Sequence, residues 1–293
     1  MSFCKFIWNY RSVILIFALE QSFRIKNKLK NKQMKFKDKY GSYALVTGAS
    51  SGIGAEMAVQ LAQKGLNLVL VARRQDKLEQ LRERIKRNAN VTIRIIALDL
   101  LSNNFLETIK KTTDDLDIGL LVNNAGTMYI GNYLDCSLDR ELQMINLNIK
   151  VPLVLTKHFA PKMVEKKKGG LIYTASMLGY MGTPYSSIYA GTKAFEIVKG
   201  EGLAYELKPY NIDVLTLNPG LTDTEMTANN DFSGMPMKLM KPNVVAKTAI
   251  NALGKKVLVT PGVMNNIMNW MSKRIMSRKM NTSMFGMFMK KTF

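Results

Sequence analysis

Short apolar runs alternate with segments of helical periodicity over most of the chain. Six runs have the near-continuous hydrophobicity of strands that are buried on both faces. We expect these strands at residues 43–47, 68–72, 92–98, 120–123, 171–175 and 214–217. Between them, residues 55–64 and 74–87 repeat their apolar positions with the period of a helix. This alternation predicts an α/β protein with a single, doubly wound parallel sheet covered by helices on both faces.

The two ends of the chain differ from this body in pattern and in charge. Of the formal net charge of +20, residues 1–39 carry +8 and residues 255–293 carry another +8, which leaves +4 for the rest. We therefore divide the chain into a basic extension at 1–39, a central domain at 40–262 and a basic, Met-rich tail at 263–293. The apolar run at 13–19 is too short to span a bilayer. Two interpretations of the extension stay open: translation starts at Met34, or the extension is a basic segment close to a membrane.

Composition narrows the class of protein further. With 47% hydrophobic residues, the 293 residues are enough for one large core. Cys4 and Cys136 are too few for a disulfide framework, and the single histidine, His158, lies in an apolar stretch, so no metal site is predicted. The body contains no nucleic-acid-binding motif, so no nucleic-acid partner is expected, and the expected location is cytoplasmic.

The first apolar run continues into a glycine-rich turn with the sequence TGASSGIG. Its glycines would let the backbone approach a pyrophosphate closely, and the helix beyond them would present free N–H groups and a partial positive charge. Two serine hydroxyls add further donors. The turn therefore predicts a dinucleotide site of the Rossmann type. The candidate residues are Gly48, Ser50, Ser51, Gly52, Ile53 and Gly54.

The residues after the second expected strand indicate which dinucleotide is bound. A carboxylate there would hold the ribose hydroxyls of NAD, but the strand ends in Arg73 and Arg74, with no acid before Asp76. Guanidinium groups bind a phosphate with two-pronged geometry, so the arginine pair favours NADP(H). Asp99, after the third expected strand, is placed to receive the adenine amine.

Tyr189 and Lys193 are four residues apart and would share one face of a helix. Ser176 follows an expected strand thirteen residues earlier, and Asn148 lies on a helix upstream. Reduction of a ketone builds negative charge on its oxygen, which a serine hydroxyl can stabilise. A phenol, with an ordinary pKa of about 10, becomes a useful acid–base group beside an ammonium. The four residues therefore predict an oxidoreductase in which a nicotinamide carries the hydride.

Together, TGASSGIG, the NNAG sequence at 123–126, the spacing of Ser176, Tyr189 and Lys193, and the PG pair at 219–220 resemble the short-chain dehydrogenase/reductase family over about residues 40–262. The resemblance implies that Asn148 completes a catalytic tetrad; Asn146 competes for this role, but the spacing from Asn148 to 155–157 fits the family better. It also implies that Lys193 binds the nicotinamide ribose and that the backbone at Asn148 holds a proton-relay water. Further cofactor contacts are implied at Asn124, Ala125, Gly126, Tyr189, Lys193, Pro219, Gly220, Thr222 and Thr224.

One departure from the family concerns the cofactor. Many NADP-dependent members carry a basic residue inside the glycine turn, where this chain has Ser51. The expectation of NADP(H) therefore depends on Arg73 and Arg74. Gly200 and Gly202 lie in the expected helix after Lys193, where glycine is unfavourable, and the sequence pattern assigns no function to either.

In the family, the segment after the PG pair covers the substrate. Here residues 225–241 include Met226, Phe232, Met235, Met237, Leu239 and Met240. Such an adaptable apolar lining predicts a small hydrophobic carbonyl or alcohol substrate, such as an acyl, steroid or retinoid group, with packing inside the lid as the alternative. Resemblance to the 3-oxoacyl-CoA reductases of fatty-acid elongation makes that activity the alternative function. A non-catalytic NADP-binding regulator is a further alternative, against which the complete tetrad argues.

The tail has a regular apolar stripe. Met264, Ile267, Met268, Met271 and Ile275 fall on one side of an expected helix, and Asn265, Asn266, Asn269 and Lys273 fall elsewhere. The stripe favours contact with a second subunit of a homodimer or homotetramer, with a membrane surface through the basic ends, or with the protein's own core. Lys290 and Lys291 resemble a dilysine retrieval signal, which in a eukaryotic cell would place the protein at the endoplasmic reticulum.

Overall fold

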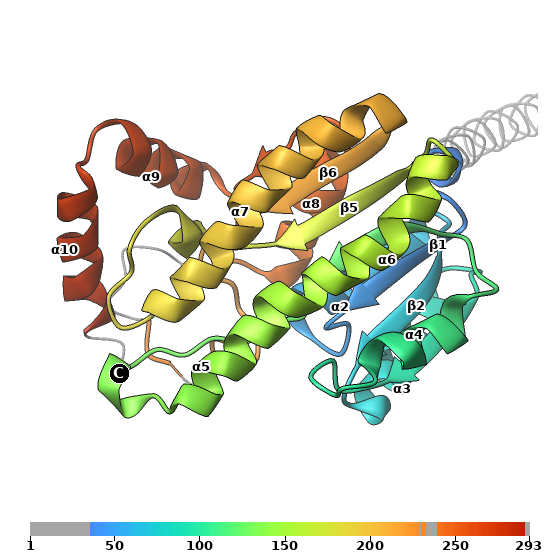
Figure 1. Ribbon diagram of the computed structural model, residues 1–293, viewed down its shortest axis with the longest axis horizontal. Helices are drawn as coiled ribbons and strands as arrows, with labels where there is room; N and C mark the ends of the chain where they lie inside the picture. The colour runs from blue at the N-terminus through green and yellow to red at the C-terminus, as the bar shows by residue number, and fades with distance from the viewer. Residues whose placement is uncertain (1–35, 229, 233–238, 291–293) are drawn as a thin grey trace, which may run out of the picture.

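A seven-stranded parallel sheet forms the centre of the protein, with the strand order β3-β2-β1-β4-β5-β6-β7 (Figure 1). The computed structural model describes residues 36–228, 230–232 and 239–290, so the alternative start at Met34 lies outside the described residues. The strands are β1 (Tyr43–Thr47), β2 (Asn67–Ala72), β3 (Ile93–Ala97), β4 (Ile118–Asn123), β5 (Gly169–Thr174), β6 (Ile212–Leu217) and β7 (Leu258–Val259). The expected α/β class is confirmed; β7 was missed because two residues are too few to form a pattern.

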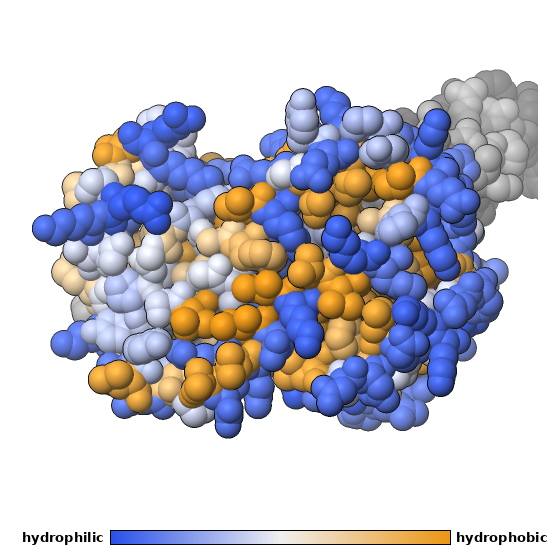
Figure 2. All heavy atoms as spheres, in the orientation of Figure 1, coloured by the Kyte–Doolittle hydropathy of each residue, from blue (hydrophilic) through white to orange (hydrophobic). Residues whose placement is uncertain are grey.

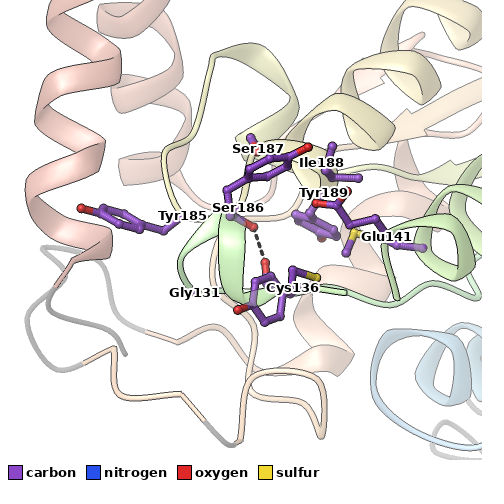
Figure 3. A pocket seen from close by; sticks show the side chains of 11 residues that line it. Gly131, Cys136, Glu141, Tyr185, Ser186, Ser187, Ile188 and Tyr189 are labelled. Atoms are coloured by element: carbon purple, nitrogen blue, oxygen red, sulfur yellow. Dashed lines mark hydrogen bonds between the residues drawn. The ribbon is translucent and has the colours of Figure 1, made fainter. Parts of the chain in front are cut away.

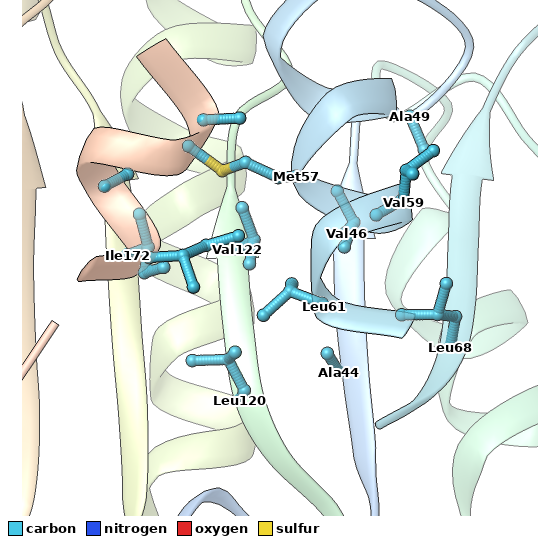
Figure 4. Close-up of a cluster of buried hydrophobic side chains, with 14 of the residues drawn as sticks. Ala44, Val46, Ala49, Met57, Val59, Leu61, Leu68, Leu120, Val122 and Ile172 are labelled. Atoms are coloured by element: carbon cyan, nitrogen blue, oxygen red, sulfur yellow. The ribbon is translucent and has the colours of Figure 1, made fainter. Parts of the chain in front are cut away.

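Helices cover both faces of the sheet, as the near-continuous apolar strands require. One face packs against α2 (Gly52–Gln63), α3 (Gln75–Lys86) and α8 (Pro242–Ala252), with a core that Figure 4 shows in part. The other face packs against α4 (Phe105–Thr113), α6 (Val151–Glu165) and α7 (Ser187–Leu207). Alternate strand residues divide between the two cores: Val46 belongs to the first and Leu45 to the second. The fold is therefore doubly wound.

The direction of winding reverses between β1 and β4. The chain first moves outward from β1 to β2 and β3, and then returns to place β4 against the free side of β1, with Val46 opposite Val122. Open α/β sheets bind ligands in the crevice at the carboxyl ends of the strands where the order reverses. The glycine-rich turn after Thr47 and the asparagines that end β4 lie at this edge.

Two glycines allow close contact between helices and backbone or strand. A Cβ at Gly54 would lie 2.4 Å from the carbonyl oxygen of Gly48, so only glycine lets α2 start directly against the turn. A Cβ at Gly200 would lie 2.0 Å from the Thr216 hydroxyl, which explains this glycine by the packing of α7 on β6. At Gly202 the nearest side-chain atom is 3.9 Å away, and nothing in the structure explains that residue.

The central domain begins slightly before residue 40. Residues 36–40 are helical, Tyr40 is 2% exposed, and Phe36 packs against the first core. The Tyr40 hydroxyl donates a 2.6 Å hydrogen bond to Asp213, and the Lys39 ammonium pairs with the same carboxylate at 2.6 Å. These contacts attach residues 36–40 to the sheet, next to the predicted boundary between 39 and 40.

The tail forms two helices, α9 (Val263–Arg274) and α10 (Arg278–Met289), at one end of the molecule (Figure 1). The sequence pattern predicted the first helix but not the second. A Cβ on Gly286 of α10 would lie 3.2 Å from Pro184, in the loop that joins β5 to α7. None of the helices formed by the described residues has both the length and the apolar character needed to cross a bilayer.

Candidate active site

The glycine-rich turn has the backbone geometry of an anion site. Gly48 and Gly52 have φ angles of +66° and +57°, which L side chains rarely adopt. Ser51 precedes α2, its side chain caps no N–H group there, and the first turn of the helix contains no acid. The helix N-terminus therefore keeps its donors and its partial positive charge for a ligand, and it fits a pyrophosphate.

The end of β4 braces this turn. The Asn124 amide nitrogen donates to the carbonyl oxygens of Thr47 at 3.1 Å and Gly48 at 3.3 Å. The Thr47 hydroxyl oxygen in turn accepts from the backbone N–H groups of Asn124 at 2.9 Å and Ala125 at 3.0 Å. Asn124 is a predicted cofactor contact, and its side chain holds the turn in place.

A polar cluster lies beside the turn, where the sequence predicted a phosphate site. The Arg74 guanidinium donates to Ser50 at 3.0 Å, to Ser51 at 3.3 Å and to the Glu225 carboxylate at 2.6 Å. Hydrogen bonding from Arg74 lowers the pKa of Glu225, and the same bond raises the pKa of Arg74. Arg73 is exposed. Sequence reasoning missed Glu225, because it follows Arg74 by 151 residues and belongs to the expected lid.

Asp99, the expected partner of the adenine amine, is exposed in the loop after β3. Its carboxylate accepts a 2.9 Å hydrogen bond from the N–H of Leu101. A carboxylate oxygen has more than one acceptor site, so this bond leaves capacity for a further donor.

Asn148 lies fully buried at a break in helical regularity. Between α5 (Leu138–Ile145) and α6, residues Asn146–Lys150 form a π-helical turn (η2), a feature that often marks functional sites. The Asn148 side-chain oxygen accepts from the N–H of Thr127 at 3.0 Å, and its nitrogen donates to the carbonyl of Thr127 and to the hydroxyl of Thr192, both at 3.0 Å. Asn146, the rival candidate, is exposed. The turn therefore directs Asn148 toward α7.

Lys193 is buried and held from two sides. Its ammonium donates to the carbonyl of Thr174, at the end of β5, at 2.7 Å and to the Glu196 carboxylate at 2.8 Å. The ammonium nitrogen is also 5.7 Å from the centroid of the Tyr189 ring. An ammonium has three donors, so one remains for a ligand. Lys193 is 4% exposed and Glu196 1%, so this is a fully desolvated ion pair.

The charge balance at this pair depends on Glu196. Burial lowers the pKa of Lys193, but attraction to Glu196 and Tyr189 outweighs burial, so the pKa is raised overall. Burial raises the pKa of Glu196, and Lys193 offsets part of that effect. Nearby, burial lowers the pKa of Lys199 to about 8, and its ammonium lies 4.2 Å from the centroid of the Tyr173 ring. Sequence reasoning missed Glu196, although a carboxylate three residues after a lysine on the same helix is a detectable signal.

Ser176 is 8% exposed and lies at the carboxyl end of β5. Its hydroxyl oxygen accepts a 3.2 Å hydrogen bond from the N–H of Leu178, which leaves its own O–H free to donate elsewhere. The short helix that follows, Met177–Tyr180 (η3), packs directly on α7: a Cβ at Gly179 would lie 2.7 Å from the carbonyl carbon of Lys193. Ser176 is thus held against the helix that carries Tyr189 and Lys193.

A pocket opens beside Tyr189, between α5 and the segments at 129–136 and 185–189 (Figure 3). Ser186 joins two of its walls, because its hydroxyl donates to the carbonyl of Tyr129 at 2.9 Å. The Tyr185 side chain points away toward α10. The lining residues are Tyr129, Gly131, Tyr133, Cys136, Glu141, Met144, Tyr185, Ser186, Ser187, Ile188 and Tyr189. A carbonyl group in this mixed aromatic and polar pocket would lie next to Tyr189.

The PG pair after β6 lies at the same edge of the sheet. Thr222 is 4% exposed, and its backbone forms an isolated β-bridge with Met240. The Thr224 methyl group lies 3.0 Å from the position that a Cβ on Gly52 would take. Within the expected lid, Phe232 is buried, whereas Met226 and Leu239 are 41% and 48% exposed. Met235 and Met237 lie outside the described residues. The expected lid therefore begins next to the glycine turn, where the Ser51 hydroxyl donates a 3.0 Å hydrogen bond to the Glu225 carboxylate.

Comparison with known proteins agrees with this arrangement. Residues 42–232 match the family model for short chain dehydrogenase. A 7beta-hydroxysteroid dehydrogenase from Clostridium sardiniense is 32% identical over 79% of this chain and 90% of its own length. A very-long-chain 3-oxoacyl-CoA reductase from Mus musculus is 33% identical over 78% of this chain and 73% of its own length. Among solved structures, a short-chain dehydrogenase from Sphingobium yanoikuyae in complex with NADPH is 28% identical, has a TM-score of 0.71, and matches 80% of this chain and 96% of that one.

Proposed function

The chain belongs to the short-chain dehydrogenase family, and on that premise we propose that it transfers a hydride between NADPH and the carbonyl or alcohol carbon of a hydrophobic substrate. Membership makes the chain an oxidoreductase that acts on carbonyl or alcohol groups with a nicotinamide cofactor. The observation that carries the proposal is the buried, ion-paired Lys193 beside Tyr189 at the wall of a pocket.

Each residue has a task that follows from its contacts. The bound nicotinamide would supply or accept the hydride. The Tyr189 hydroxyl would give its proton to the substrate oxygen during reduction, and the Ser176 O–H would donate a hydrogen bond to the same oxygen as charge develops there. The Lys193 ammonium supplies a positive charge close to the Tyr189 ring. Asn148, bonded to Thr127 and Thr192, fixes the packing of the π-helical turn against α7.

NADPH is proposed over NADH because Arg74, Ser50 and Ser51 form a set of donors beside the glycine turn. In the structure the Glu225 carboxylate is the anion that these donors bind. The side chains of the Arg74–Glu225 ion pair are partly exposed, at 42% for Arg74 and 55% for Glu225. A 2′-phosphate carries more charge than a carboxylate and would compete for the same donors. The NADPH complex of the Sphingobium relative supports the choice.

Two opposite variants test the cofactor proposal. Arg74→Gln is expected to lower the ratio of kcat/KM for NADPH to that for NADH by about tenfold or more, because a charge-assisted hydrogen bond is lost. Glu225→Gln is expected to raise the same ratio, because Arg74 loses its competing carboxylate. The ratios are measured with any accepted ketone. An NADH preference in the unmodified protein, or equal ratios in all three proteins, would contradict the proposal.

The substrate class is proposed from the pocket and from the relatives. The lining includes Tyr129, Tyr133 and Met144, whose rings and methyl group would contact an apolar part of the substrate. Relatives named as a hydroxysteroid dehydrogenase and as a 3-oxoacyl-CoA reductase are 32% and 33% identical to this chain over the aligned residues, so reduction of a very-long-chain 3-oxoacyl-CoA is the second candidate. Turnover of a ketosteroid and of a 3-oxoacyl thioester, measured side by side, separates the two. Turnover of neither, with NADPH bound, would favour a non-catalytic NADP-binding protein.

We also propose a homo-oligomer, formed through an apolar face on α5, α6 and α7. Figure 2 shows hydrophobic side chains gathered over α6 and α7. The exposed members of this face are Leu138, Leu142, Ile145, Leu153, Phe195 and Val198. The mass of the protein in solution, measured by light scattering, should be a multiple of 33.0 kDa. A mass equal to that of one chain would contradict the proposal.

A further inference from the structure

Helix α9 lies on the body with its polar side inward. Asn265 is 7% exposed, and its amide nitrogen donates to the carbonyl of Pro261 at 2.8 Å and contacts the Met240 sulfur at 3.3 Å. A Cβ on Gly220 would lie 2.7 Å from that nitrogen, so Asn265 fits tightly against the PG pair. In α10, Asn281 is 3% exposed and donates to the carbonyl of Ser272 at 2.8 Å. Asn265 therefore attaches α9 to the body and Asn281 attaches α10 to α9, while Phe285 and Met289 of α10 are buried at 5% and 1% exposure. The apolar stripe of α9 is not the side that meets the body.

The apolar side of α9 consequently faces solvent. At 3.6 residues per turn, its exposed apolar side chains fall in one sector of the helix, opposite Asn265. Most of the stripe predicted from the sequence belongs to this sector, which also contains Trp270 and Val263. The exposed fractions are 78% for Val263, 61% for Met264, 46% for Ile267, 59% for Trp270, 41% for Met271 and 62% for Ile275. We call these six residues the tail face.

The charged residues of the tail itself all have one sign. Residues 255–293 contain eight Lys or Arg and no Asp or Glu. Arg274, Arg278 and Lys279 are exposed at the end of α9 and the start of α10, close in sequence to the tail face. Pairing with a second copy through this face would bring two basic surfaces together, which electrostatics opposes. A negatively charged surface would be attracted instead.

We propose that the tail face docks on the surface of a membrane that contains anionic lipids. An amphipathic helix with large apolar side chains on one side, a tryptophan among them and basic residues around it has the composition of a helix that lies in the membrane interface. Methionine side chains adapt to an irregular apolar medium. The same helices touch the catalytic domain at Gly220 and, through Gly286, at Pro184 in the loop before Tyr189. Docking would therefore hold the side of the enzyme that carries the PG pair close to the lipid.

Vesicle flotation of the full chain tests the proposal. The protein is mixed with vesicles of phosphatidylcholine alone, or of phosphatidylcholine with phosphatidylserine, and the floated fraction is measured. We expect binding to the anionic vesicles, weakened when ionic strength rises from about 0.1 M to 1 M, which shortens the Debye length from roughly 10 Å to 3 Å. The double variant Ile267→Gln and Trp270→Gln is expected to bind about tenfold or more weakly, because two apolar side chains lose their burial in lipid.

A matched control separates the tail face from general surface hydrophobicity. Val244, at the start of α8, is 45% exposed, close to the 46% of Ile267, so Val244→Gln removes a similar exposed apolar group elsewhere. It should float like the unmodified protein. Thermal unfolding should be the same in all three proteins, because the substituted side chains are exposed.

Three outcomes would overturn the proposal. No flotation with anionic vesicles would contradict it directly. If the double variant floated as well as the unmodified protein, another part of the chain would be responsible for lipid binding. A mass that falls in the double variant without lipid, measured by light scattering, would show that a second copy covers the tail face.

Discussion

Replacement of Tyr189 by phenylalanine is expected to lower kcat by about 10²- to 10⁴-fold, the usual contribution of a positioned general acid. The ring is 7% exposed and packs in the wall of the pocket, so phenylalanine keeps its volume and loses only the hydroxyl. Because the Lys193 ammonium keeps its bonds to Thr174 and Glu196, the affinity for NADPH should change little. Steady-state turnover and NADPH binding by calorimetry measure the two quantities separately.

The control for this variant is on the same helix. Tyr205 is 84% exposed, so Tyr205→Phe removes an equivalent hydroxyl with no expected effect on turnover. If Tyr189→Phe kept a substantial part of kcat, proton transfer would have to be assigned to another group. If it lost NADPH binding as well, the substitution would have disturbed the site rather than removed a proton donor.

Substitution of Glu196 by glutamine is expected to lower stability and to shift the pH dependence of turnover. The carboxylate is 1% exposed and pairs with a buried ammonium, so its removal leaves the Lys193 charge without an anionic partner, at a cost of roughly 3–5 kcal/mol. Glu196 raises the pKa of Lys193, so Lys193 stays charged to higher pH in the unmodified protein. Without Glu196, the alkaline loss of activity should therefore begin at a lower pH. Burial lowers the pKa of Lys199 to about 8, and Glu196 partly offsets this effect. Loss of the Glu196 charge should therefore lower the pKa of Lys199 as well.

Glu206→Gln is the matched control, because Glu206 is an exposed carboxylate on the same helix. It should leave both thermal unfolding and the pH profile unchanged. Glu196→Asp, which keeps the charge on a shorter side chain, should restore part of the pH profile. A profile in Glu196→Gln that coincides with that of the unmodified protein would mean that Glu196 contributes to packing but not to the charge state of Lys193.

The sequence pattern predicted those parts of the molecule that depend on neighbouring residues. Apolar runs located six strands to within a few residues, and the glycine turn and the Tyr189–Lys193 pair placed the candidate chemistry at one edge of the sheet. The contact between Arg74 and Glu225 could not be predicted in this way, because it joins residues 151 positions apart. Nor could the close approach of α7 to β6 at Gly200, which depends on where β6 lies.

The orientation of α9 could not be predicted from the sequence for a different reason. Periodicity identifies an apolar stripe on α9, but it does not indicate which side of the helix meets the body. In the structure the asparagine side meets the body, because Asn265 fits against Gly220 and bonds to Pro261. Because Asn265 contacts Gly220, removal of the tail would also remove a contact with the PG pair. Point variants on the tail face therefore test its role better than truncation after Gly262.

We propose above all that the chain moves a hydride between a nicotinamide and a carbonyl carbon, with Tyr189 as the proton donor. The most direct measurement uses NADPH that carries deuterium at the transferable position of the nicotinamide, with ketosteroid and 3-oxoacyl substrates analysed by mass spectrometry. We expect an alcohol product with one deuterium on the former carbonyl carbon, formed by the unmodified protein and almost absent with Tyr189→Phe. An alcohol without deuterium, or equal deuterium transfer by both proteins, would contradict it.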